Sequence, residues 1–131
     1  MTYMLDTNTC IFAMKQQENV LSRLLYHNPE DICISSITYA ELCFGVDKSN
    51  FPEKNRLALM LFLSEIAVRP FDSSAAEEYG TIRSALERAG TPIGPLDMLI
   101  ASHAKALGAI IVTNNTKEFK RIKGLKMEDW K

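Results

Sequence analysis

Short apolar runs alternate along this chain with longer segments of helical period, and this alternation restricts the fold more than any other feature. The runs lie at residues 3–5, 32–34, 66–68, 109–113 and 125–127. Strands separated by helices need crossover connections, which join parallel rather than antiparallel neighbours. We therefore expect an α/β fold of three layers, in which a central, mainly parallel sheet of four or five strands lies between two layers of helices.

The helical segments carry their own start and stop signals. Pro95 suits the first turn of a helix, and Gly90 and Gly108 suit the position that follows a last turn. Ser74 and Glu77 stand at the spacing of a capping box. The predicted helices cover roughly residues 7–15, 18–26, 36–46, 52–65, 72–90 and 95–107.

The size and composition of the chain limit what kind of protein it is. Its 131 residues suit one domain, 1–131, with a single core. The net charge is −1, so any attraction to nucleic acid has to come from a local patch of basic residues. Three cysteines without metal-binding spacing are typical of a reducing compartment. The longest apolar run, residues 57–63, is too short to cross a membrane. We expect a cytoplasmic protein with no membrane association.

Three acidic residues occur where strands end or helices begin. Asp6 directly follows the first strand, Glu41 lies in the first turns of the helix after the second strand, and Asp97 lies in the turn that opens at Pro95. Asn115 follows the strand at residues 109–113 in the same way. Ligands of open α/β sheets bind beyond the carboxyl ends of the strands. We therefore expect Asp6, Glu41 and Asp97 to converge there on one cation.

Each of the three acids also has a purely structural explanation. Asp6 can cap a helix, Glu41 can close a capping box with Thr38, and Asp97 can face the positive end of a helix dipole. The apolar neighbours of Glu41 and Asp97 favour a functional role instead, because a solvated charge rarely occurs in such a context. Clustered carboxylates need a cation to offset their repulsion, and ligands that are all oxygens favour Mg²⁺, with Mn²⁺ as the alternative.

Four motifs make the whole chain similar to a known family. They are Met4–Asn8, Ser36–Leu42, Pro92–Asp97, and Ile111–Asn115 with Glu118-Phe119 after it. With them the sequence resembles the PIN-domain nucleases and, among these, the VapC-type toxins of bacterial toxin–antitoxin pairs.

The resemblance implies roles for particular residues. Asp6, Glu41 and Asp97 correspond to the catalytic acids that bind metal in the family. The fourth acid of the family falls at Asn115, where this chain departs from the pattern; an asparagine there can still orient a water. Three further residues are expected beside the acids: the hydroxyls of Thr7 and Thr113, and Glu118, which can reach the site from the next turn.

The resemblance also implies an activity and partners. The activity is that of an endoribonuclease in which a cation polarises the scissile phosphate and activates a water, leaving a 5′-phosphate. Similarity to enteric VapC-type toxins implies cleavage of a tRNA in its anticodon stem-loop, with initiator tRNA as the leading candidate. Translation would then be inhibited until a cognate VapB-type antitoxin binds, and the toxin would form a homodimer within a larger complex.

A basic stretch near the C-terminus has two interpretations. It contains five positive residues in ten, which either contact the RNA backbone or form a solvated tail. These residues are Lys117, Lys120, Arg121, Lys123 and Lys126.

Other functions stay open on the sequence alone. A haloacid-dehalogenase-like phosphatase would use Asp6 as its nucleophile, although Asn8 stands where that motif needs a second aspartate. A PIN scaffold that only binds RNA or a partner is compatible with Asn115. A Ser–His–Asp hydrolase has no support, because His103 faces away from Asp97 on their helix and His27 stands alone.

The helix at residues 52–65 has an unusual pattern. Its run 57–63 is apolar nearly all the way round, whereas a helix on the outside of a three-layer domain needs only one apolar stripe. Either neighbouring helices bury both faces, or part of the run, with Phe44 and Leu24 or Leu25, binds a partner.

Overall fold

Five parallel strands form one sheet at the centre of the protein. The computed structural model describes all 131 residues, and the strand order is β3-β2-β1-β4-β5, with every neighbouring pair parallel. The strands are β1 Tyr3–Leu5, β2 Ile32–Ser35, β3 Ala67–Arg69, β4 Ile110–Val112 and β5 Met127–Glu128. The predicted three-layer α/β/α architecture is confirmed.

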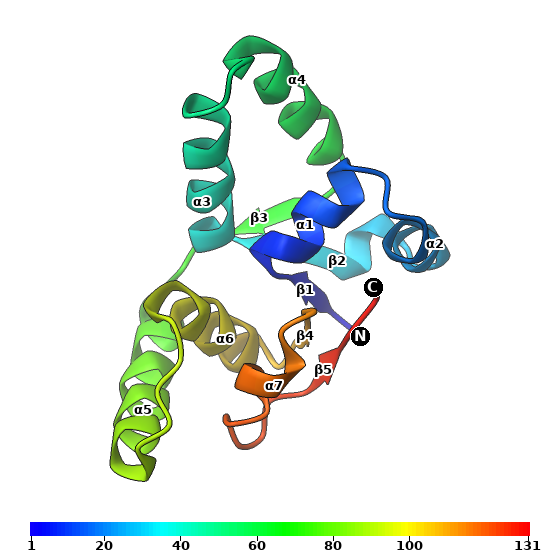
Figure 1. Cartoon of the computed structure of the whole chain (residues 1–131). Helices are drawn as coiled ribbons and strands as arrows, with labels where there is room; N and C mark the ends of the chain where they lie inside the picture. Colours follow the sequence, from blue (N-terminus) through cyan, green and yellow to red (C-terminus); the bar gives the residue numbers. More distant parts are fainter.

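Helices cover both faces of the sheet (Figure 1). One layer contains α1 Thr7–Met14, α2 Glu18–Tyr26, α3 Ser36–Asp47 and α4 Pro52–Phe62, with a 3₁₀ turn at Pro29–Asp31. The other layer contains α5 Ser73–Ala89, α6 Pro95–Leu107 and α7 Thr116–Phe119. None of these helices is both long and apolar enough to span a membrane.

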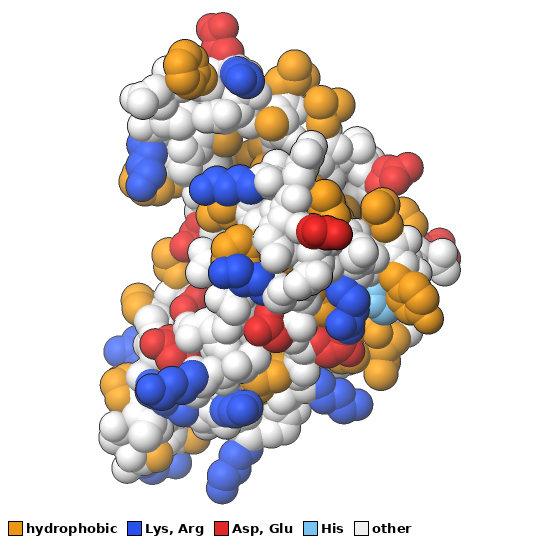
Figure 2. Space-filling view, turned by 45° about the vertical axis from the view of Figure 1, so that its right-hand side comes forward, with side chains coloured by type: hydrophobic (Ala, Val, Ile, Leu, Met, Phe, Trp, Pro, Cys, Tyr) orange, Lys and Arg blue, Asp and Glu red, His pale blue; other side chains and the backbone are white.

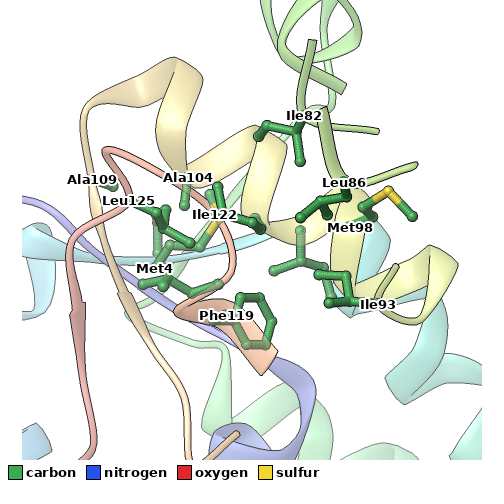
Figure 3. Packing of buried hydrophobic residues seen from close by; sticks show 14 residues of the cluster. Met4, Ile82, Leu86, Ile93, Met98, Ala104, Ala109, Phe119, Ile122 and Leu125 are labelled. Atoms are coloured by element: carbon green, nitrogen blue, oxygen red, sulfur yellow. The ribbon is translucent and has the colours of Figure 1, made fainter. Parts of the chain in front are cut away.

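The side chains of each strand alternate between two cores. Met4 and Ile111 point into a cluster of 14 buried residues with α5, α6 and α7, and Figure 3 shows Met4 and Phe119 packed there with side chains of the neighbouring helices. Leu5 and Val112 point the other way, into a cluster of 11 buried residues with α1 to α4. This period of two is the geometry of a strand buried on both faces.

Two local predictions are wrong. The helix α5 is capped by Asp72, whose carboxylate accepts a 3.0 Å hydrogen bond from the Ala75 amide, and not by a capping box at Ser74. The reason is that the chain is already extended at Asp72, a residue type that caps helices as well as serine does. The last strand pairs at Met127 rather than at residues 125–127, because Leu125 packs into the core instead.

The order of strands makes β1 a topological switch point. This strand pairs with β2 on one side and with β4 on the other, so the chain leaves the centre of the sheet in opposite directions. Such a switch point is where open α/β sheets bind ligands, just beyond the carboxyl ends of the strands. Asp6 and Thr113 are the residues that follow β1 and β4 at this point.

Candidate active site

Asp6 combines a structural role with a buried charge. Its Oδ1 accepts a 2.9 Å hydrogen bond from the Thr9 amide and so caps α1. The side chain is only 3% exposed, and burial raises the pKa of this carboxyl, while hydrogen bonds from Thr113 and Thr9 offset part of the rise. Capping does not use all the lone pairs of a carboxylate, so Asp6 keeps acceptor capacity for a ligand.

Glu41 lies on α3, where its charge acts on Asp6. This helix begins at Ser36 and is capped by Ser35, so Glu41 lies in its second turn and the capping box with Thr38 does not form. Instead, the Thr7 hydroxyl donates a 2.5 Å hydrogen bond to Oε1 of Glu41. The structure therefore places Thr7 beside one of the three acids, as expected.

Asp97 carries the clearest electrostatic signal of the site. It lies in the first turn of α6 and is half-buried. Burial, followed by the negative charges of Asp6, Glu41 and Glu118, raises its pKa to about 6. Four carboxylates from four different segments therefore lie close enough for their negative charges to interact.

Asn115 is connected both to Glu118 and to the rest of the site. Its side-chain amide donates a 2.9 Å hydrogen bond to Oε2 of Glu118, and its backbone amide donates a 2.9 Å hydrogen bond to the Thr113 hydroxyl. The same Thr113 hydroxyl is hydrogen-bonded to Asp6. Glu118 therefore provides a carboxylate near the position where the family pattern has its fourth acid, and Asn115 orients it.

The residues present fit a hard divalent cation. The chain has four ion pairs, and none of them involves Asp6, Glu41, Asp97 or Glu118, so their charge is not neutralised by the protein. Oxygen donors in a negative field suit Mg²⁺ or Mn²⁺ better than softer metals.

The expected convergence of the three acids on one ion-sized space is not seen. No three Asp, Glu, His or Cys side chains lie close enough to share an ion. The Glu41 carboxylate is instead hydrogen-bonded to the Thr7 hydroxyl. The roles of the individual acids in binding a metal stay a prediction.

A buried contact that the sequence did not reveal joins two of the helices that carry acids. Nδ1 of His103 on α6 lies 2.8 Å from the hydroxyl of Ser35, which caps α3. Both side chains are buried, and burial lowers the pKa of His103. The ring and the hydroxyl are hydrogen-bonded, with donor and acceptor set by the tautomer of the ring. This pair fixes α3 against α6, and with them the spacing of Glu41 and Asp97.

The basic stretch is a fixed part of the fold, not a tail. We call residues 116–126 the basic segment; Phe119, Ile122 and Leu125 anchor it in the core. Its five cationic side chains are exposed, and none is in an ion pair. On the face shown in Figure 2, Lys and Arg side chains gather in the lower part, below several acidic side chains.

Comparisons with known proteins agree with this geometry. The family described as "PIN domain" matches residues 3–125. The chain is 47% identical over 128 residues to the "tRNA(fMet)-specific endonuclease VapC" of Shigella flexneri, covering 98% of this chain and 97% of that protein. It is 46% identical over 134 residues to "Ribonuclease VapC2" of Rickettsia felis, covering 99% and 98%.

Solved structures agree as well. The DNA-bound VapBC complex from Salmonella typhimurium contains a chain with a TM-score of 0.95 and 46% identity, covering 100% of this chain and 99% of that one. A chain of the promoter-bound VapBC2 complex from Rickettsia felis has a TM-score of 0.94 and 43% identity, with complete coverage of both chains. The protein therefore belongs to the PIN-domain family and, within it, to the VapC ribonucleases. The predicted resemblance is confirmed.

The contact between Asn115 and Glu118 gives a first prediction. If Asn115 acts by orienting Glu118, Asn115→Ala lowers Mn²⁺ affinity about 10-fold in the wild-type protein but has little effect in Glu118→Gln. Titration calorimetry of the two single variants and the double variant measures this coupling. Asn114→Ala is the matched control, because that exposed neighbour contacts only Asp129. Additive effects of the two changes would show that Asn115 acts independently of Glu118.

The pKa of Asp97 gives a second prediction, for the protein in EDTA. Because the pKa of this carboxyl is about 6 in the folded state against 3.8 ordinarily, the folded state holds the proton more tightly. Its contribution to the free energy of unfolding is therefore present below about pH 4 and is lost as the pH rises through about 6. Urea unfolding should show a loss of stability between these pH values that Asp97→Asn lacks. Equal pH profiles for the two proteins would contradict the assignment.

Proposed function

We propose that this protein is a metal-dependent endoribonuclease toxin that cleaves a tRNA in its anticodon stem-loop, with initiator tRNA as the leading substrate. The observation that carries the proposal is the group of uncompensated carboxylates around Asp97 at the switch point of the sheet. Support for the substrate comes from the relatives, two of which are named as endonucleases specific for tRNA(fMet). The place of action is the cytoplasm, where tRNA is used.

Asp6, Glu41 and Asp97 are the proposed metal-binding and catalytic acids. Mg²⁺, or Mn²⁺ in its place, supplies Lewis-acid stabilisation of the phosphate charge and lowers the pKa of an attacking water. Thr7 orients the carboxylate of Glu41, and Asn115 orients that of Glu118. Asp6 is held by the start of α1, so these carboxylates lie on fixed supports.

The basic segment supplies the proposed contacts to the RNA backbone. An acidic site repels a polyanion, so positive charge has to lie next to it, and this segment directly follows Asn115 and contains Glu118. The contacting residues are Lys117, Lys120, Arg121, Lys123 and Lys126.

The phosphatase alternative is not favoured by the site. Asp6 would have to act there as a nucleophile, yet Oδ1 caps α1 and the side chain is 3% exposed. An inactive PIN scaffold would bind RNA or a partner but would not cleave RNA when a divalent metal is added, and a cleavage assay measures this difference.

A VapB-type antitoxin is the proposed partner, within a larger complex that contains a toxin dimer. The solved complexes that this chain resembles are described as VapBC complexes. The apolar surface of α3 and α4 suits such a partner: Phe44, Phe51, Leu57, Met60 and Leu61 are each at least 59% exposed. Leu59 of the same helix is buried, so only part of the run at 57–63 is available.

A groove between the same two helices and α1 contains one of the acids, Glu41. It has a volume of about 330 Å³ and runs between α1, α3 and α4, with Met14, Val46 and Ala58 among its lining residues and Glu41 at its polar side. An antitoxin helix in this groove can extend a basic residue to Glu41, which would neutralise the site and block access of RNA.

Removal of single carboxylates tests the catalytic part of the proposal. Asp6→Asn, Glu41→Gln and Asp97→Asn should each abolish cleavage of the anticodon stem-loop in Mg²⁺, and EDTA should abolish it for the wild type. Asparagine still caps a helix, so Asp6→Asn should keep the fold. Fragments should carry 5′-phosphates. Glu77→Gln, an exposed acid of α5, is the control and should cleave normally. Wild-type activity in Asp97→Asn, or no cleavage by the wild type with any divalent metal, would contradict the proposal.

The antitoxin surface gives a separate prediction. Met60→Glu places a charge in the middle of the exposed apolar side of α4 and should weaken the complex with the antitoxin by at least tenfold, roughly the effect of losing a central interface residue. Ala76→Glu, at an exposed position of α5, makes the same charge change outside that surface. Calorimetry with the purified antitoxin measures both. Equal affinities of the two variants would place the antitoxin elsewhere.

A further inference from the structure

A second groove lies on the other side of the molecule, between α5, α6 and the basic segment. Its volume is about 310 Å³, close to the lower limit for small-molecule sites. Ile82 and Leu86 of α5 and Ile122 of the basic segment form its apolar floor. Figure 3 shows these three side chains in the core between α5 and the C-terminal part of the chain.

The rim of this groove is positively charged. Lys105, Arg121 and Lys123 line it. Only Lys105 has an acidic partner, Glu78, which lies 3.8 Å from its ammonium. Arg121 donates a 2.9 Å hydrogen bond to the carbonyl of Pro92, which fixes its guanidinium and leaves other N–H groups free. The rim therefore carries a net positive charge, because its three cations have one acidic partner among them.

The floor and the rim together select the chemistry of the occupant. A ligand that fits has a flat apolar part for the floor and a negative charge for the rim, and a nucleotide of an RNA strand has both. Proteins bind single strands with a positively charged groove along the backbone and with surfaces that cover the bases. In this groove the covering surface is aliphatic rather than aromatic.

The position of the groove relative to the acids also favours RNA. Arg121 contacts Pro92, in the loop that leads into α6 and Asp97. Lys105 lies eight residues after Asp97 on the same helix, about 12 Å along its axis. That length equals the rise of about three or four stacked nucleotides in one strand. A strand with its scissile phosphate at Asp97 can thus reach the groove.

We propose that this groove binds one unpaired nucleotide of the RNA substrate a few positions from the scissile phosphate, with its base on Ile82, Leu86 and Ile122 and its phosphate at the basic rim. The inference rests on the proposed function for the identity of RNA as the substrate. Beyond the proposed active site, the groove would select RNA that has an unpaired segment at a fixed distance from the cleaved bond.

A pair of variants on α5 tests the groove. Ala85→Glu adds a negative charge to its wall, and Ala76→Glu adds the same charge to an exposed position on the opposite side of the same helix. Fluorescence anisotropy in EDTA, where no cleavage occurs, measures the Kd for a labelled anticodon stem-loop. We expect Ala85→Glu to raise the Kd about tenfold and Ala76→Glu to leave it nearly unchanged. Equal Kd values would overturn the proposal.

Binding of a duplex RNA of the same length shows whether the groove binds an unpaired base or only backbone phosphates. If the groove takes an unpaired base, Ala85→Glu weakens binding of the stem-loop far more than binding of the duplex. Equal losses for both RNAs would mean that only phosphates are bound, and the nucleotide site would be wrong. If Ala85→Glu keeps its RNA affinity but no longer binds the antitoxin, the occupant is a protein and the proposal fails.

A lysine variant tests the groove independently, in case Ala85→Glu does not fold. Lys123→Gln should lower the salt dependence of RNA binding by about one unit of slope in log Kd against log salt, whereas Lys54→Gln on α4, also exposed, should not. Equal slopes would count against the groove even if Ala85→Glu proved unstable. The proposed function fails separately, if the wild type binds RNA through this groove but never cleaves it in Mg²⁺.

Discussion

Repulsion between carboxylates at the carboxyl edge of β1 and β4 is the constraint on which the rest of the structure depends. Burial and three neighbouring negative charges raise the pKa of Asp97 to about 6, and no lysine, arginine or histidine pairs with the group. Such an arrangement lowers the stability of the folded protein near neutral pH, so it persists only where the surrounding fold is strong enough to hold it. The two cores on either side of the sheet provide that strength.

Different hydrogen bonds hold Asp6, Glu41 and Glu118, and a further buried contact links the helices that carry Glu41 and Asp97. Asp6 is fixed by the start of α1, Glu41 by Thr7, and Glu118 by Asn115. The buried pair of Ser35 and His103 then fixes the helices of Glu41 and Asp97 against each other. Because the ring of His103 stays neutral, this link adds no charge to the site. These hydrogen bonds keep the carboxylates near one another although no lysine or arginine side chain pairs with them.

The fold, and the position of the three acids beside the carboxyl edge of the sheet, could be predicted from sequence because both depend on local patterns. The convergence of the acids on one cation was predicted too, but the structure does not show it. Short apolar runs ended by Asp6 or by a helix start place side chains at the edge of a parallel sheet whatever the details of packing. The contacts of Asn115 with Glu118 and of Ser35 with His103 could not be predicted. The first depends on a four-residue helix, too short to show periodicity, and the second joins residues 68 positions apart whose rotamers only the packed core determines. Lys105 was missed for the same reason, since only the tertiary fold brings it to the basic segment.

A net charge of −1 and an acidic crevice would together repel RNA, so chemistry and attraction have to reside on different surfaces. The basic segment achieves this separation at short range: buried Phe119, Ile122 and Leu125 alternate with exposed cations directly after Asn115. The apolar surface of α3 and α4 lies in the other layer of helices, where the groove between α1, α3 and α4 contains Glu41. A partner bound there can therefore close the active site without occupying the basic segment, so inhibition and RNA attraction need not compete for the same residues.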